Sequence, residues 1–301
     1  MDSQDPSLSR RAVLAGTAAL LAMPAKGAGK LKVAIFSKHL QFLHGEALAK
    51  GAAEIGFDSV DITVRKGGHI EPENAREELP KLVAIIRQHG LEVPMITTDI
   101  VDPSTPHAEA ILKTMAELGI RQYRWGGFRY QKGTPFPAQL DAMKPRIAAL
   151  AALNKRYQVC AMYHTHSGVN LVGAPIWDLY ILLKDFDPQA VAVNYDVAHA
   201  TIEGGLGGWI DSFHIIGPYL HGIAVKDYVW AKDPRRGWRE RWVPLGEGMV
   251  HFPEFFKMVA DANFSGPLQM HFEYPLTPET SAPAMKRDLA RLRTYLAQAD
   301  L

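Results

Sequence analysis

Short apolar runs alternate with helical patterns along the chain from Leu31 onward. Between the runs, apolar residues recur every three or four positions, as in residues 111–118, 140–150 and 285–296, which is typical of amphipathic helices. Strands that alternate with helices favour a parallel sheet, because each helix returns the chain to the edge where the strand began. Eight runs have the length and composition of strands: residues 31–37, 57–64, 91–98, 120–126, 157–164, 190–196, 220–227 and 267–273.

Eight strand and helix units predict a single-domain α/β protein, a (β/α)₈ TIM barrel that spans residues 30–301. Barrels of this kind occupy about 250 residues. The 301 residues of the chain, 47% of them hydrophobic, can form one core of that size. An open doubly wound sheet is the alternative fold, but no G-x-G-x-x-G phosphate turn follows the first strand.

The first 29 residues have the composition of an export signal. Arg10 and Arg11 precede an apolar run at 12–22, followed by Pro24 and small residues, an order typical of twin-arginine signals. The run is about half the roughly 20 residues that a membrane-spanning helix needs. We therefore expect residues 1–29 to be a signal peptide and linker, with no stable membrane anchor and a periplasmic or secreted protein. A tail with two chance arginines is the alternative.

Charge and cysteine content exclude some partners and sites. Lys and Arg number 33 against 32 Asp and Glu, so no broad basic field is present and nucleic acid is not an expected partner. A single cysteine, Cys160, excludes an internal disulfide and a CxxC zinc or redox motif. Any metal site must therefore use His, Asp or Glu. The oligomeric state stays open, with a homo-oligomer among the alternatives.

Polar residues gather at the carboxyl ends of the predicted strands, which is where barrels of this kind carry their chemistry. Side chains two apart on a strand share a face, so His164 points with His166 and His271 points with Glu273. Burying many ionisable groups without partners is costly, which favours a ligand or metal between them. The strand-end residues are Asp61, Arg124, Trp125, His164, His166, Asp196, His199, Lys226, Asp227 and Glu273.

Other polar and aromatic residues have a plainer interpretation. The charged run 232–241 is either a phosphate clamp or, as is more usual for such loops, a solvated segment. Four histidines have no partner in the pattern and are interpreted as solvated or turn residues: His39, His44, His69 and His89. Three tryptophans either stack on a sugar ring or pack the base of the charged loop: Trp230, Trp238 and Trp242.

Five motifs together resemble the xylose isomerase-like barrels, a family that includes sugar phosphate isomerases, ketose 3-epimerases, inosose dehydratases and endonuclease IV. The resemblance extends from Leu31 to about Leu296. It rests on GFDSVDI at the second strand, NYDVAHA after the sixth, AVKD at the seventh, and PLGEGMVHFPEFF leading to SGPLQMHFEY at the eighth.

The resemblance implies a divalent metal, for which Mn²⁺, Mg²⁺, Co²⁺ and Zn²⁺ are the candidates. Relatives bind it through a carboxylate on strand five, an Asp on strand six, a His on strand seven and a Glu on strand eight. Asp196 and Glu273 match two of these positions, and His164 stands where many relatives have Glu. The strand-seven position is Ala224. Either three protein ligands hold the metal, or the metal is lost and Lys226 supplies the positive charge.

The resemblance also implies chemistry on a small carbohydrate. Isomerisation, epimerisation and β-elimination of a keto sugar all begin by removing a proton next to the carbonyl, and a divalent cation stabilises the resulting enediolate. We predict an isomerase or epimerase of a small keto sugar or derivative, with Glu273 as the base. The further acid or base groups are His166, His199 and Lys226. The predicted substrate contacts are Asp61, Arg124, Trp125 and Trp230.

The histidine at strand five leads to one alternative, and the missing histidine at strand seven leads to a second. Symmetric epimerisation uses one carboxylate on each side of the substrate, whereas a lyase, dehydratase or hydrolase acting on an oxidised sugar or glycoside needs one base and one acid. A non-catalytic carbohydrate-binding barrel is the second alternative, because loss of the strand-seven ligand also fits lost catalysis. An endonuclease IV-like enzyme would need more metal ligands and a basic groove for DNA.

Overall fold

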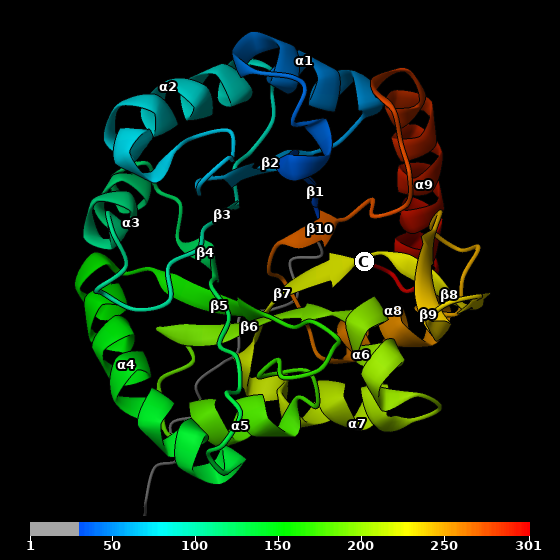
Figure 1. The fold of residues 1–301 in the computed structure, drawn as a ribbon. Coiled ribbons are helices and arrows are strands. Elements are labelled where there is room, and N and C mark those ends of the chain that lie inside the picture. The colour runs from blue at the N-terminus through cyan, green and yellow to red at the C-terminus, as the bar shows by residue number, and fades with distance from the viewer. Residues whose placement is uncertain (1–29) are drawn as a thin grey trace, which may run out of the picture.

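The protein is described by a computed structural model of residues 30–301, so the expected export signal lies outside the described part. Parallel strands close into a barrel in which β1 pairs with both β2 and β10 (Figure 1). The predicted TIM barrel is therefore confirmed. Its strands are β1 (Val33–Phe36), β2 (Ser59–Thr63), β3 (Met95–Thr97), β4 (Gln122–Trp125), β5 (Cys160–His164), β6 (Val191–Asp196), β7 (Leu220–Val225) and β10 (Leu268–Met270).

Helices surround the strands because each presents an apolar side to the barrel (Figure 1). In α8 the buried apolar residues are Phe252, Phe255, Phe256 and Val259. Helix α1 ends at Gly56, whose φ of 105° is left-handed and disfavours any residue with a Cβ. The helices are α1 (Gly45–Ile55), α2 (Ala75–Gln88), α3 (Ala108–Glu117), α4 (Phe136–Tyr157), α5 (Trp177–Leu183), α6 (Val197–Gly204), α7 (Gly208–Ile215), α8 (Phe252–Asp261) and α9 (Pro278–Gln298), with short 3₁₀ turns at η1 (Ser37–Leu40), η2 (Pro72–Asn74) and η3 (Gly217–Tyr219). No helix of residues 30–301 is long and apolar enough to cross a membrane.

Successive residues of the barrel strands face outward and inward in turn. On β6, Val193 and Tyr195 belong to the large apolar core, whereas Asn194 and Asp196 face the barrel interior. Gln269 of β10 contacts the sulfur atom of Met95 of β3 across the barrel, so both side chains point inward. A small apolar cluster lines the interior with Met95, Cys160, Met162 and Ala192. Many polar side chains also face the interior, together with Phe36, whose ring stacks on His271 with centroids 4.7 Å apart.

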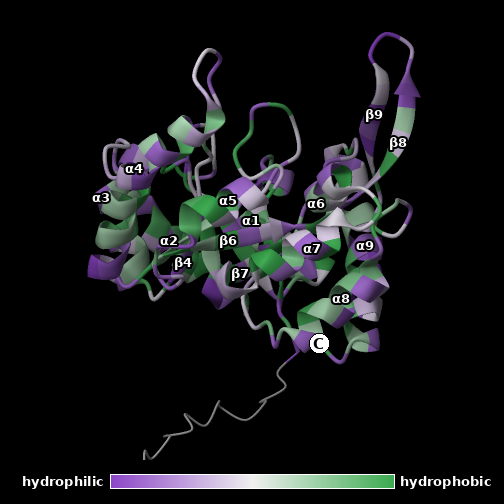
Figure 2. Cartoon of the chain, turned by 90° about the horizontal axis from the view of Figure 1, so that it is seen from below, coloured by the Kyte–Doolittle hydropathy of each residue, from purple (hydrophilic) through white to green (hydrophobic). Residues whose placement is uncertain are grey.

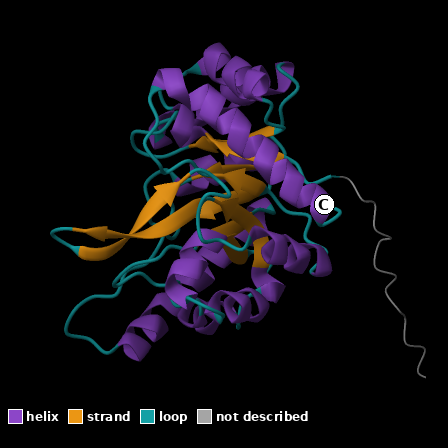
Figure 3. Ribbon diagram, turned by 90° about the vertical axis from the view of Figure 1, so that its right-hand side faces the viewer, coloured by secondary structure: helices purple, strands orange, loops and turns teal. Residues whose placement is uncertain are grey.

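A two-stranded antiparallel hairpin follows β7 directly, formed by β8 (Asp227–Asp233) and β9 (Gly237–Val243). It projects from the body on the side opposite the C-terminus (Figures 2 and 3). This side carries the carboxyl ends of the barrel strands. The sequence suggested a charged loop for 232–241, and the structure places most of that segment in the outer half of this hairpin.

Candidate active site

The barrel interior contains buried polar atoms that lack a hydrogen-bond partner within residues 30–301. Leaving one such atom unpaired costs about 1–3 kcal/mol, so a cluster of them indicates a place for water, a metal or a substrate. All lie on barrel strands or directly after one: Ser59 Oγ, Asp61 Oδ1, Arg124 Nε, His164 Nε2, Asn194 Oδ1, Asp196 Oδ2, Gln269 Oε1 and His271 Nε2.

Asp196 ends β6, and its carboxylate caps α6. Its Oδ1 accepts hydrogen bonds from the backbone N–H groups of Ala198 and His199, each at 3.1 Å, at the positive end of the helix. The other oxygen, Oδ2, lies 3.0 Å from Lys226 Nζ as an ion pair. Burial alone would raise the pKa of Asp196, but the Lys226 ammonium and neighbouring imidazoles hold it well below its usual range. The carboxylate is therefore ionised inside the barrel.

Lys226 also fixes the tautomer of His199. Its Nζ lies 2.8 Å from His199 Nε2, and an ammonium has donors only, so Nε2 accepts. The proton of the neutral ring is then on Nδ1, which donates to Ser167 Oγ at 2.7 Å. Burial, followed by the charge of Lys226, lowers the pKa of His199 well below its usual range. The ammonium has three donors, of which His199 engages one, so donors remain for a substrate oxygen.

His164 and His271 also lie close to Asp196. Their rings stack with centroids 5.2 Å apart, and His164 Nε2 lies 3.5 Å from Asp196 Oδ2. Each of the three residues offers a ligand atom within 4.8 Å of the other two. Two histidines and a carboxylate form a donor set suited to divalent transition metals. Burial lowers the pKa of both histidines well below the usual range, which keeps them in the neutral form that binds metal. These three residues fit a metal.

Asn194 orients His164 from within the barrel. The amide Nδ2 lies 3.0 Å from His164 Nδ1, while the amide oxygen has no partner within residues 30–301. Turning the amide by half a rotation would place its oxygen against Nδ1–H and leave the Nε2 lone pair free for a metal. The amide has room because residue 222 is glycine: a Cβ at Gly222 would lie 2.8 Å from the Asn194 oxygen.

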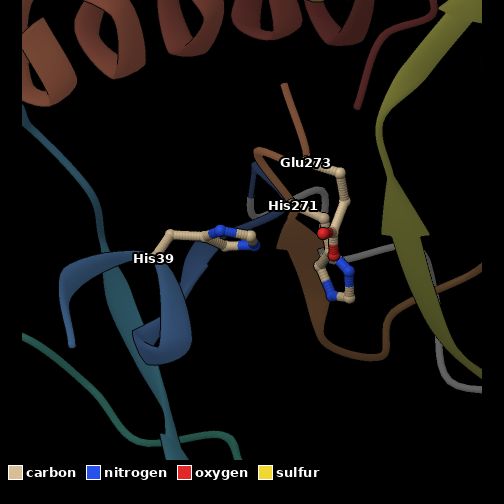
Figure 4. Close-up of side chains that lie close together, drawn as sticks. All are labelled: His39, His271 and Glu273. Carbon is tan, nitrogen blue, oxygen red and sulfur yellow. The ribbon is translucent and has the colours of Figure 1, made fainter. Parts of the chain in front are cut away.

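Glu273 belongs to a second group nearer the surface, with His39 and His271 (Figure 4). His39 Nε2 accepts the backbone N–H of Phe272 at 3.1 Å, and burial, followed by Lys38 and Lys226, lowers the pKa of His39 to about 3. The side chain of Glu273 is 26% exposed and lies 3.5 Å from Lys38 Nζ. The structure thus groups His164 and Asp196 with His271, and it places Glu273 at the mouth, where a substrate can reach it.

His166 lies close to His164 of the proposed metal group and to His199 beside Lys226. Its ring centroid is 4.6 Å from that of His164 and 5.0 Å from that of His199. Burial, with smaller effects of Arg124 and Lys226, lowers its pKa to about 4. His166 is therefore neutral at physiological pH, with its Nδ1 3.1 Å from the His164 carbonyl oxygen.

The predicted substrate contacts lie in three different places. Asp61 and Arg124 are inside the barrel: Asp61 Oδ2 accepts the Thr97 hydroxyl at 2.8 Å, and burial raises the pKa of Asp61 to about 7. Trp125 belongs to the apolar layer outside the strands, where its indole donates to the Val101 carbonyl at 3.0 Å, so the structure does not bring it to the site. Trp230 is on the hairpin and 41% exposed.

Several residues of the site, among them Asn194, were not selected from the sequence. His271 was assigned to the face of Glu273 but not to the metal, His39 was interpreted as solvated, and Ser167 was not considered. Strand alternation was the available signal for His271, because it predicts the face that the side chain shares. The contact between His39 and Phe272 joins the 3₁₀ turn after β1 to the segment after β10, and it depends on barrel closure.

The fold and this interior define a TIM barrel with a polar, acid–base site at the carboxyl end of its strands. The chain belongs to the xylose isomerase-like TIM barrel family, whose sequence profile matches residues 49–295. No curated protein matches the sequence.

Several solved structures share the fold. The 3-keto-D-glucoside 4-epimerase of E. coli is 17% identical with a TM-score of 0.65, over 88% of this chain and 100% of that one. A probable 3-DHS dehydratase of Bacillus anthracis is 18% identical with a TM-score of 0.65, over 87% and 99%. A xylose isomerase-like TIM barrel protein of Mycobacterium smegmatis, in complex with magnesium, is 16% identical with a TM-score of 0.64, over 89% and 97%. At these identities the likeness is one of fold.

Proposed function

We propose that the protein is an isomerase or epimerase that removes a proton next to the carbonyl group of a small keto sugar or sugar derivative. The observation that carries this proposal is the combination of the partly exposed Glu273 with the buried, ionised Asp196–Lys226 pair, because His271 lies close to both carboxylates. Proton removal needs a base that the substrate can reach and a positive charge for the enediolate oxygen. The epimerase among the similar structures supports the same class of reaction.

Each step can be assigned to groups of this chain. Glu273 takes the proton from the carbon next to the carbonyl. Lys226 directs a free donor at the carbonyl oxygen and stabilises the negative charge that develops there. Epimerisation then delivers a proton from solvent to the opposite side of the same carbon. We assign this delivery to His199, 2.8 Å from Lys226, and to His166, whose ring centroid lies 5.0 Å from that of His199. The neutral state of both histidines means that they relay a proton rather than hold a permanent charge.

A divalent metal would be held by His164, Asp196 and His271. When bound, it would act as a Lewis acid on the carbonyl and hydroxyl oxygens of the sugar. Asn194 would orient His164 for this role through its amide oxygen. The magnesium complex among the similar structures is consistent with a metal in this fold, and the donor set of this chain does not discriminate between Mn²⁺, Mg²⁺, Co²⁺ and Zn²⁺.

A lyase, dehydratase or hydrolase acting on an oxidised sugar or glycoside is the second candidate. The specific observation in its favour is the chemical asymmetry of the site, which offers one partly exposed carboxylate, Glu273, and imidazoles with an ammonium as the other groups. Elimination needs one base and one acid for the leaving group, which such a site provides. The dehydratase of similar fold supports this candidate.

Hydrogen exchange in deuterated water tests both candidates against a non-catalytic barrel. The purified chain, with each divalent metal added in turn, is incubated with ketohexoses and 3-keto-hexosides and followed by NMR. We expect deuterium next to the carbonyl, lost in Glu273→Gln and retained in Glu254→Gln on the outer helix α8. A new epimer identifies an epimerase, and an unsaturated or cleaved product identifies a lyase. Substrate binding with no exchange in any combination would support the carbohydrate-binding barrel.

A further inference from the structure

The hairpin after β7 has one aromatic face. Cross-strand partners in an antiparallel pair point to the same side, and so do residues two apart on a strand. The pairs Tyr228–Trp242, Trp230–Glu240 and Lys232–Trp238 are therefore on one side, and Val229–Arg241 and Ala231–Arg239 are on the other. We call the first side the aromatic face, formed by Tyr228, Trp230, Lys232, Trp238, Glu240 and Trp242.

The base of the aromatic face is part of the active site. Lys226 Nζ lies 4.7 Å from the centroid of the Trp242 ring, and the His199 ring meets the same indole edge to face at 5.3 Å. Trp230 and Trp238 are on the same face of the hairpin as Trp242, so they extend the aromatic surface that begins at the active site. The strand rise separates successive levels by about 7 Å.

The outer part of the aromatic face is open to solvent. Trp230 is 41% exposed and Trp238 is 66% exposed, on a hairpin that projects from the barrel (Figures 2 and 3). Each level combines one indole with one polar side chain, Glu240 beside Trp230 and Lys232 beside Trp238. A pyranose ring has C–H groups on its faces and hydroxyls on its edge, so this combination suits a sugar unit at each level.

The charges on the hairpin favour a neutral saccharide. On the aromatic face Lys232 and Glu240 balance each other, whereas Arg239 and Arg241 point to the opposite side. An anionic ligand would be better served by that opposite side, which does not contain the indoles. Arg239 and Arg241 therefore do not form a phosphate clamp on the side of the hairpin that faces the active site.

We propose that the aromatic face is an extended saccharide-binding site, so that the substrate is a glycoside or oligosaccharide. The reacting sugar lies in the barrel, and the units beyond it stack on Trp230 and Trp238. The identity of the reacting unit rests on the proposed function, whereas binding along the face does not. Trp242 forms the junction between the two parts.

Calorimetric titration with unreactive saccharides tests the extended site without turnover. The probes are methyl glucopyranosides, cellobiose with cellotetraose, and maltose with maltotetraose. We expect a tetrasaccharide of one series to bind at least 10-fold tighter than its methyl glycoside. Each of Trp230→Ala and Trp238→Ala should weaken tetrasaccharide binding about 2- to 10-fold. The methyl glycoside is too short to reach Trp238, so its affinity should stay within twofold in Trp238→Ala.

Arg239→Ala is the matched control, because it changes an exposed residue of the same hairpin on the opposite face. Equal affinities for short and long probes in both series would overturn the proposal, as would an equal loss in Arg239→Ala. Sedimentation velocity provides the remaining outcome: a wild-type dimer that dissociates in both tryptophan variants, with saccharide binding unchanged, would make the face a contact between copies. Length-dependent binding without hydrogen exchange would remove the proposed function and leave the extended site standing.

Discussion

The ammonium of Lys226 lies 3.0 Å from Oδ2 of Asp196 inside the barrel, and the same ammonium lies 2.8 Å from His199 Nε2. The seventh strand, where metal-binding relatives place a histidine, here carries Ala224, and the positive charge two residues later faces the same interior. Lys226 therefore contacts the carboxylate of Asp196, the imidazole of His199 and the Trp242 ring of the aromatic face. Its removal should affect turnover more than substrate binding.

Lys226→Met keeps the aliphatic stem and deletes the charge. We expect turnover to fall about 10² to 10³-fold, the usual cost of losing one electrostatic stabiliser of an oxyanion. Unfolding free energy should also fall by several kcal/mol, because Asp196 is left as a buried charge without its partner. Kinetics per folded molecule, with the folded fraction taken from a denaturation curve, separate the two effects. A variant that melts early but turns over at a near wild-type rate would make Lys226 a structural residue.

The metal set can be tested by metal content after dialysis. Asp196→Ala and His271→Ala should each lower occupancy more than about 10-fold, since losing even an outer partner of a ligand typically costs 10- to 100-fold in affinity. Glu273→Gln should keep the metal and lose hydrogen exchange, because its carboxylate lies in the group nearer the surface. Full occupancy in His271→Ala, together with loss in Glu273→Gln, would instead favour the ligands predicted from the sequence.

The strands could be predicted because an apolar run between helical patterns is a local signal, and the eight runs correspond to the eight barrel strands. The grouping within the site could not be predicted equally well. His271 reaches His164 across the barrel from a strand that is not its neighbour, and no sequence spacing encodes that distance. Trp125 was predicted with the strand-end residues. It follows Arg124, which points inward, so its own side chain points to the outer apolar layer. The arginines of the hairpin favoured a charged loop, although the alternation of its tryptophans with other residues is typical of strands.

Export is a separate prediction that concerns residues outside the described part of the chain. Replacing Arg10 and Arg11 by Lys keeps the charge but removes the guanidinium pair typical of twin-arginine signals. We expect the precursor to accumulate in the cytoplasm, measured by cell fractionation and immunoblotting. Lys26→Arg, which leaves the pair intact, is the control. An unchanged periplasmic yield in the double variant would contradict the assignment.

Asp61 should make stability depend on pH. Burial raises its folded pKa to about 7, against the ordinary value of 3.8, and the opposing effects of the Thr97 hydrogen bond and of Arg124 and Arg65 are smaller. Between these values the unfolded chain releases the proton and the folded chain keeps it. The contribution of the protonated carboxyl is therefore complete below about pH 4, is lost as pH rises, and changes little above about pH 7.

Asp61→Asn isolates this effect, because an amide stays neutral and its oxygen can still accept the Thr97 hydroxyl. We expect the variant to gain unfolding free energy relative to wild type between pH 5 and pH 8, by roughly 2 to 3 kcal/mol, as the wild type is forced to bury a charge. Urea denaturation at several pH values measures the difference. Asp141→Asn, at an exposed position of α4, should show no such trend. A constant difference across the range for Asp61→Asn would mean that this carboxyl ionises alike in the folded and unfolded chains, which would contradict the prediction.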